Sequence, residues 1–175
     1  MRKITPVIVV VIFFLFTGLM PPPTEDTNAK IKAVFLYNFT KYIEWPKTYK
    51  EGNFIIGLYG INSSLSAELN KMAATKSVGT QKFEIKTMSS LDGANKCHML
   101  FIPSTSGGQF SEVVSKLKGQ STLIITEKPG LTKQGAAINF VVQDNKQKFE
   151  LNKANAEKYD LKVSSNLASL AVVVE

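Results

Sequence analysis

Cys97 and His98 are the residues of this sequence whose types most suggest catalysis, because a thiol and an imidazole can serve as nucleophile and base. They are the only cysteine and the only histidine of the chain. The two are adjacent at the start of an apolar run, and neighbouring residues of a strand point to opposite faces. A nucleophile and its base need hydrogen-bond contact. We therefore expect two buried structural residues and no catalytic pair.

Other catalytic arrangements are equally hard to assemble. One histidine and one cysteine are too few for a typical cluster of metal ligands. Glu84 and Glu150 fall on the polar faces of alternating segments, where carboxylates are usually solvated. The sequence therefore predicts no catalytic residue, no metal site and no cofactor.

Two polar loops offer a candidate crevice for a small ligand. Each follows an apolar run and leads into a predicted helix, and ligands of open parallel sheets bind beyond the carboxyl ends of strands. The helix starts also present free backbone N–H groups to an anion. Neither loop has the phosphate-loop pattern GxxxxGK[ST], and ordinary turn and capping chemistry is the alternative. The candidate residues are Gly60, Asn62, Ser104, Thr105 and Ser106.

An aromatic helix is predicted over residues 31–45 and ends before Pro46, since the residue preceding a proline avoids helical geometry. Its apolar positions step by three or four residues: Ile31, Phe35, Phe39 and Tyr42 or Ile43. Leu36 and Tyr37 widen this stripe, so we expect the helix to pack on a sheet and to keep an apolar flank for something else. We expect Trp45 to anchor its end in the core.

The remaining pattern predicts a single compact α/β domain over residues 30–175. Strands are expected over 54–60, 82–88, 98–102, 121–126, 138–143 and 147–151, and further helices over 64–74, 109–118, 153–159 and 164–174. The last two strands form an antiparallel hairpin. The order of elements predicts a mixed, mainly parallel sheet with helices on both faces and this hairpin at the C-terminal end.

Residues 1–29 are predicted to be a signal peptide followed by a polar spacer. Arg2 and Lys3 precede an apolar run over residues 7–16, which is shorter than the roughly 20 residues that span a bilayer. An uncleaved signal anchor is the alternative. Cleavage could occur near residues 17–18 or 27–29, and we expect the protein to be exported.

The charge of the chain argues against nucleic-acid binding. The net charge is +7, but the excess is almost all lysine, and Arg2 is the sole arginine. Bidentate recognition of phosphates and guanines relies on arginine. A basic surface facing anionic envelope material is the better interpretation. With one cysteine, no disulfide can form within the chain.

The sequence resembles the YfiR-like family of exported bacterial proteins. The matching segments are AVFLYNFTKYIEWP (33–46), IGLYG (56–60), HMLFI (98–102), GAAINF (135–140), KFELN (148–152) and LKVSSNLASLA (161–171). They cover nearly all of the predicted domain. The aromatic helix that ends in Trp45-Pro46 is the most specific of them, and the segment KFELN departs conservatively from a FEIN-like motif.

The resemblance implies a periplasmic α/β protein without enzymatic activity. The best-understood members of that family repress a membrane diguanylate cyclase by holding the periplasmic part of that enzyme, so that envelope stress raises cyclic di-GMP in the cell. The implied partner is the periplasmic domain of a membrane signalling protein, and another envelope protein is the second candidate. A periplasmic small-molecule-binding module is the alternative function.

We predict the partner surface on the outer flank of the aromatic helix, at Tyr37, Lys41 and Glu44. The helix carries more aromatic side chains than one stripe facing a sheet can bury, and aromatic residues concentrate in interface hot spots. The alternative is that neighbouring helices cover both flanks.

Overall fold

The computed structural model describes residues 25–172. The predicted signal peptide up to residue 24 lies outside the described residues. Among those described, no helix is both long and apolar enough to cross a bilayer.

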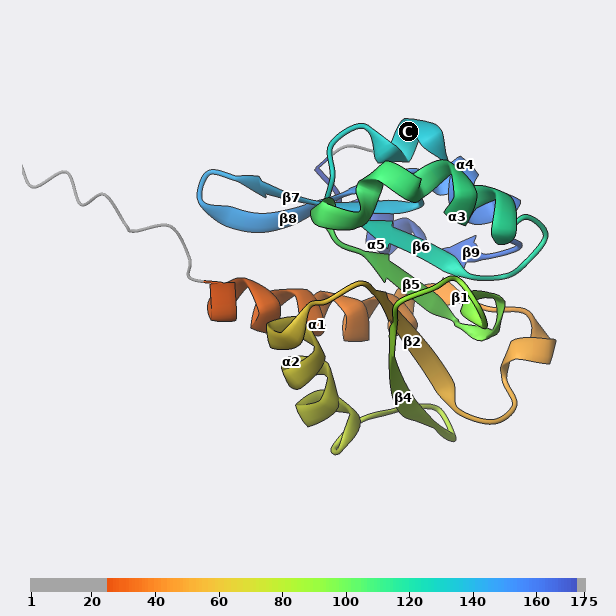
Figure 1. Ribbon diagram of the computed structural model, residues 1–175. Coiled ribbons are helices and arrows are strands. Elements are labelled where there is room, and N and C mark those ends of the chain that lie inside the picture. The colour runs from red at the N-terminus through yellow and green to blue at the C-terminus, as the bar shows by residue number, and fades with distance from the viewer. Residues whose placement is uncertain (1–24, 173–175) are drawn as a thin grey trace, which may run out of the picture.

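A seven-stranded sheet forms the centre of the domain (Figure 1). In spatial order its strands are β3 (Ser77–Val78), β4 (Gln81–Met88), β2 (Phe54–Tyr59), β5 (Met99–Ile102), β6 (Leu123–Thr126), β7 (Ile138–Gln143) and β8 (Lys146–Leu151). The five strands from β4 to β7 are parallel, and β3 and β8 run antiparallel to their neighbours. The predicted mixed, mainly parallel sheet is confirmed.

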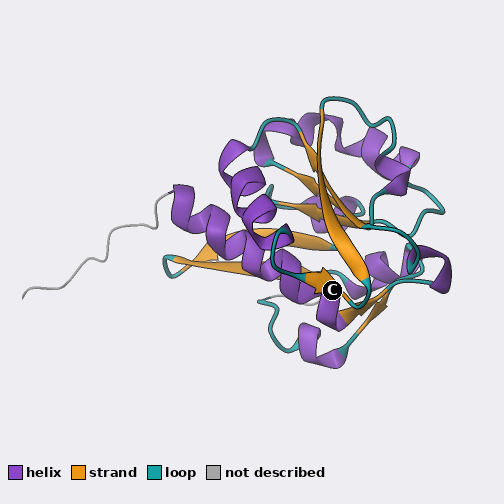
Figure 2. Cartoon of the chain, turned by 90° about the horizontal axis from the view of Figure 1, so that it is seen from below, coloured by secondary structure: helices purple, strands orange, loops and turns teal. Residues whose placement is uncertain are grey.

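Helices cover both faces of this sheet. α1 (Glu25–Tyr42) and α2 (Ser63–Ala73) lie on one face, and α3 (Phe110–Lys116) and α4 (Lys153–Lys158) lie on the other (Figure 1). Figure 2 looks onto the face with α1, which follows the grey N-terminal trace. The chain passes from β2 through α2 to β4 in one direction along the sheet, and from β5 through α3 to β6 in the opposite direction. Because both crossovers are right-handed, α2 and α3 lie on opposite faces. The chain therefore switches direction between β2 and β5.

Short elements complete the chain. The short 3-10 helices are η1 (Lys47–Tyr49), η2 (Ala94–Lys96), η3 (Ser104–Gln109) and η4 (Leu131–Gln134). A second, two-stranded sheet pairs β1 (Ile43–Glu44) antiparallel with β9 (Lys162–Val163). The last helix, α5 (Ser165–Ala168), packs against α1.

The bounds of the aromatic helix differ from the sequence prediction at both ends. α1 begins at Glu25, inside the segment interpreted as a polar spacer, because Ala29 and Ala33 bury small side chains that hydrophobic periodicity does not register. It ends at Tyr42 rather than at Trp45, because Ile43 and Glu44 leave the helix to pair with β9.

The C-terminal helix is also shorter than predicted. α5 ends at Ala168, although the apolar spacing suggested a helix to residue 174. The amide of Val172 instead donates a 2.9 Å hydrogen bond to the carbonyl of Phe149 in β8, so the backbone has left helical geometry. The free edge of β8 competes with helix formation here.

Packing between α1 and the hairpin forms one side of the core. Phe35 and Phe39 contact the rings of Phe140 and Phe149, and the centroids of Phe39 and Phe149 are 5.2 Å apart. The turn between β7 and β8 places Asp144 and Asn145 at φ of 54° and 56°, the conformation of a two-residue type I′ hairpin.

Candidate functional site

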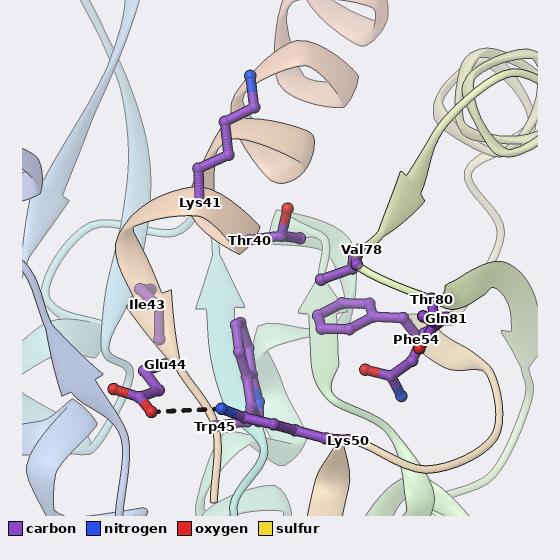
Figure 3. A pocket seen from close by; sticks show the side chains of 11 residues that line it. Thr40, Lys41, Ile43, Glu44, Trp45, Lys50, Phe54, Val78, Thr80 and Gln81 are labelled. Atoms are coloured by element: carbon purple, nitrogen blue, oxygen red, sulfur yellow. Dashed lines mark hydrogen bonds and ion pairs between the residues drawn. The ribbon is translucent and has the colours of Figure 1, made fainter. Parts of the chain in front are cut away.

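A groove of about 390 Å³ opens where α1 ends (Figure 3). It lies between the last turn of α1, strand β1 and the turn that joins β3 to β4. Its lining residues are Thr40, Lys41, Ile43, Glu44, Trp45, Lys50, Phe54, Val78, Gly79, Thr80 and Gln81. Two of the three residues predicted to contact a partner, Lys41 and Glu44, therefore line one groove.

The floor of the groove is aromatic. Trp45 and Phe54 are 5% and 1% exposed, and their rings meet edge to face with centroids 5.0 Å apart. The indole Nε1–H of Trp45 donates to the backbone carbonyl of His98 over 3.1 Å. The expected burial of Trp45 is confirmed, and one edge of its ring still reaches the groove.

His98 packs against the aromatic floor of the groove. Its ring stacks on Phe54 at 4.3 Å between centroids. Nδ1 accepts a 3.0 Å hydrogen bond from the amide of Ile55, and Nε2 lies 2.7 Å from the carbonyl oxygen of Tyr49. These partners require the neutral tautomer with its proton on Nε2, because Nδ1 must accept. Burial lowers the pKa of His98, while the hydrogen bond to Tyr49 opposes that shift.

Cys97 points away from His98, as expected for adjacent residues of an extended chain. Its Sγ lies beside the Sδ of Met88 and would be 2.9 Å from a Cβ atom at Gly57. Burial raises the pKa of the thiol to about 11, so it is protonated at neutral pH. The predicted burial of Cys97 and His98 is confirmed. Within residues 25–172, His, Cys, Asp and Glu side chains form no group of three that could hold a metal ion.

Two lysines, one lining the groove and one beside it, carry positive charge next to Tyr37. Lys41 donates to Oδ1 of Asn38 over 3.1 Å, and its Nζ lies 4.4 Å from the ring centroid of Tyr37. Lys76, which follows α2, places its ammonium 6.0 Å from the same ring. Glu44, which also lines the groove, pairs with Lys50 at 3.3 Å.

Tyr37 lies beside the groove and does not line it. The residue is half-buried, and its ring meets Phe83 of β4 at 6.1 Å between centroids. The sequence prediction named residues on the helix side of this groove and none on the opposite wall. Gly79, Thr80 and Lys76 are distant in the sequence, and no local pattern connects them with α1.

The predicted crevice at the carboxyl ends of the strands is divided into three hollows. Gly60, Thr105 and Ser106 line one of about 350 Å³. Asn62 lines a second of about 340 Å³, but its Oδ1 caps α2 by accepting from the amide of Leu65. The third, of about 410 Å³, is lined in part by Ser104.

Lys32 of α1 and Glu127 form an ion pair, and both residues line the second and the third hollow. Asn28 also lines both hollows, and its side chain ends in the acceptor Oδ1. This oxygen is buried and, within the described residues, has no hydrogen-bond partner. The five residues predicted for one crevice are thus distributed among neighbouring hollows.

The two strand carboxylates stay outside any catalytic arrangement. Glu84 accepts from Asn53 over 3.1 Å, and this hydrogen bond, followed by one from Lys86, lowers its pKa. Glu150 accepts a 3.0 Å hydrogen bond from the buried amide of Asn139. Both are better explained as parts of strand surfaces than as an acid and base pair.

Comparison with known proteins identifies a family and a fold. The sequence profile of the YfiR/HmsC-like family matches residues 29–172. None of the curated proteins matches the chain. A crystal structure of a conserved domain protein from Vibrio cholerae O1 biovar El Tor strain N16961 superposes with a TM-score of 0.57 at 10% sequence identity. The alignment covers 84% of this chain and 60% of that one, and at this identity it shows the fold alone.

Proposed function

Because the chain belongs to the YfiR/HmsC-like family, we propose that it is an exported regulator that acts in the periplasm on a membrane signalling enzyme. The family is known for periplasmic regulators of diguanylate cyclases. By this proposal the protein binds the periplasmic part of such a cyclase and represses it, which lowers cyclic di-GMP inside the cell. The family match over residues 29–172 is the observation that carries the proposal.

Regulation by binding requires a contact surface, and we assign it to the end of α1. The groove there combines an aromatic floor with charged groups at its rim, the composition typical of interface hot spots. Lys41 and Glu44 line it, and Tyr37 lies one helical turn before Lys41. Tyr37 would contribute the exposed part of its ring to the partner.

By this proposal the protein regulates its partner through binding and catalyses no reaction. The thiol of Cys97 is buried and protonated at neutral pH, and the two ring nitrogens of His98 are held by backbone groups. We expect a panel of hydrolase substrates to be left unchanged. Turnover that disappears in Cys97→Ala or His98→Ala protein would contradict this part of the proposal.

Capture of a defined partner tests the function. The immobilised chain should bind the purified periplasmic domain of a membrane diguanylate cyclase from the same organism. Tyr37→Ala should weaken capture, whereas Val34→Ala, an exposed position of the same helix, should not. Melting temperatures of both variants separate lost contact from lost fold. Absence of capture by the unmodified chain would reject the proposal.

A small-molecule-binding module is the second candidate, and Asn28 favours it. A buried acceptor without a partner is costly, and a ligand that donates to Oδ1 from either neighbouring hollow would remove that cost. A thermal-shift screen with periplasmic metabolites would test this. A hit that raises the melting temperature of the parent but not of Asn28→Ala protein would support this function.

A further inference from the structure

We infer that the groove at the end of α1 receives an extended acidic segment of the partner, with one apolar side chain seated on Trp45 and Phe54. This inference rests on the proposed function, because it specifies the chemistry of the protein that the regulator binds.

The charge balance of the groove selects an acidic segment. Glu44 is the one carboxylate among the lining residues, and Lys50 already neutralises it. Lys41 and Lys76 form no ion pair with any carboxylate of residues 25–172, and both ammonium groups lie over the ring of Tyr37. A segment with carboxylates would pair with these two ammonium groups, whereas a basic segment would be repelled.

The floor of the groove favours an apolar side chain. The groove volume of about 390 Å³ is at the low end of the roughly 300–1,000 Å³ typical of ligand pockets. The floor consists of ring edges from Trp45 and Phe54, with Val78 on the opposite wall (Figure 3). Because Trp45 and Phe54 are already 5% and 1% exposed, a leucine or a phenylalanine seated there would cover mainly the half-exposed Val78 and the remaining exposed edge of the indole.

The distribution of these features favours a segment over a small anion. Lys41 lines the groove, but Tyr37 and Lys76 lie beyond its rim. A ligand that touches both the floor and the second ammonium group must therefore extend over several residues. The opposite wall allows this, since a Cβ atom at Gly79 would meet nothing within 4 Å and β3 is the terminal strand of the sheet.

Trp45 is the only tryptophan of the chain, so its fluorescence reports directly on the groove. The probe is a blocked pentapeptide with a central leucine flanked by aspartates and glutamates. Titration with this peptide at low salt should shift the emission of Trp45, and the shift should saturate as the peptide concentration rises. Three control ligands should bind at least about fivefold more weakly than this peptide: a lysine-flanked peptide with the same central leucine, an acidic peptide with a central glycine, and free glutamate.

The variants separate this inference from the proposed function. Lys41→Ala/Lys76→Ala protein should bind the acidic peptide about fivefold more weakly, while Lys118→Ala, an exposed lysine after α3, should leave affinity unchanged. Equal binding by the double variant, or equal binding of free glutamate or of the lysine-flanked peptide, would overturn the inference. Capture of the cyclase domain that is unaffected by the double variant would overturn it too, while leaving the proposed function intact.

Discussion

The indole of Trp45 donates a 3.1 Å hydrogen bond to the backbone carbonyl of His98, which joins the end of α1 to the start of the central strand β5. His98 in turn stacks on Phe54 and holds the backbone of Ile55 and Tyr49 through its ring nitrogens. The floor of the groove and the beginning of two central strands are therefore one hydrogen-bonded unit. Changes to this unit should affect stability and the groove together.

Trp45→Ala should strongly destabilise the protein. The substitution removes the indole of a residue that is only 5% exposed. It also removes the hydrogen bond from the indole N–H to the carbonyl of His98. Loss of a large buried aromatic side chain costs about 3–5 kcal/mol in the free energy of unfolding. Urea denaturation followed by circular dichroism would measure the change.

Trp45→Phe provides the matched control, because it retains most of the packing and removes the hydrogen bond. We expect it to cost about 1–2 kcal/mol, clearly less than the alanine variant. If Trp45→Ala melted within a degree of the parent, the ring would not anchor α1, and its role in the core would be refuted.

The stability of the protein should decrease as the pH falls below about 6.5. Burial lowers the pKa of His98 in the folded state below the usual value of 6.5. Between these two values the unfolded chain binds a proton that the folded chain does not bind, so the free energy of unfolding rises with pH. The slope should approach, and not exceed, about 1.4 kcal/mol per pH unit.

His98→Gln isolates this effect, because His98 is the only histidine and most carboxylates titrate at lower pH. The variant should be less stable at pH 7.5, since the amide of Ile55 loses its acceptor. Its free energy of unfolding should vary little between pH 7.5 and 5.5. A variant that kept the slope of the parent would show that another group titrates.

The thiol of Cys97 should react with a disulfide reagent only when the protein opens. Burial raises its pKa to about 11, and the thiolate is the reactive form. We expect labelling at pH 8 to be slower than that of the urea-unfolded chain by at least about a hundredfold. Rapid labelling under native conditions would contradict the packing of Cys97 against Met88.

The strands and the hairpin were predictable because their signals are local. Continuous apolar runs identified β2, β5 and β6, and the alternation around Asp144 and Asn145 identified the β7–β8 hairpin. The start of α1 was not predictable from large apolar residues, because Ala29 and Ala33 make its first contacts. Strands β1, β3 and β9 have two residues each, so they carry no periodicity and exist through pairing alone.

The candidate site could be only half predicted for the same reason. Tyr37, Lys41 and Glu44 share one helix and the residues after it, and an excess of aromatic residues marked that helix in the sequence. The opposite wall comes from the turn after β3, whose position depends on the pairing of β3 with β4. Lys76 reaches Tyr37 only because α2 packs along α1.

Gly57→Ala should destabilise the protein through contact alone. Gly57 lies inside β2, and its φ is outside the left-handed region, so alanine meets no backbone penalty there. A Cβ atom would lie 2.9 Å from Sγ of Cys97, 3.0 Å from Cδ1 of Leu100 and 3.1 Å from Sδ of Met88. Overpacking of this kind typically costs about 1–3 kcal/mol.

A double variant separates overpacking from a general weakness of the strand. Cys97→Ala removes the sulfur that lies nearest to the added methyl group, while Leu100 and Met88 have side-chain ends that can move. In Cys97→Ala protein, adding Gly57→Ala should therefore cost less than it costs in the parent, with a coupling energy of about 1 kcal/mol in a urea-denaturation cycle. Strictly additive losses would mean that the added methyl group does not press on the sulfur of Cys97, and that Gly57 is required at this position for another reason.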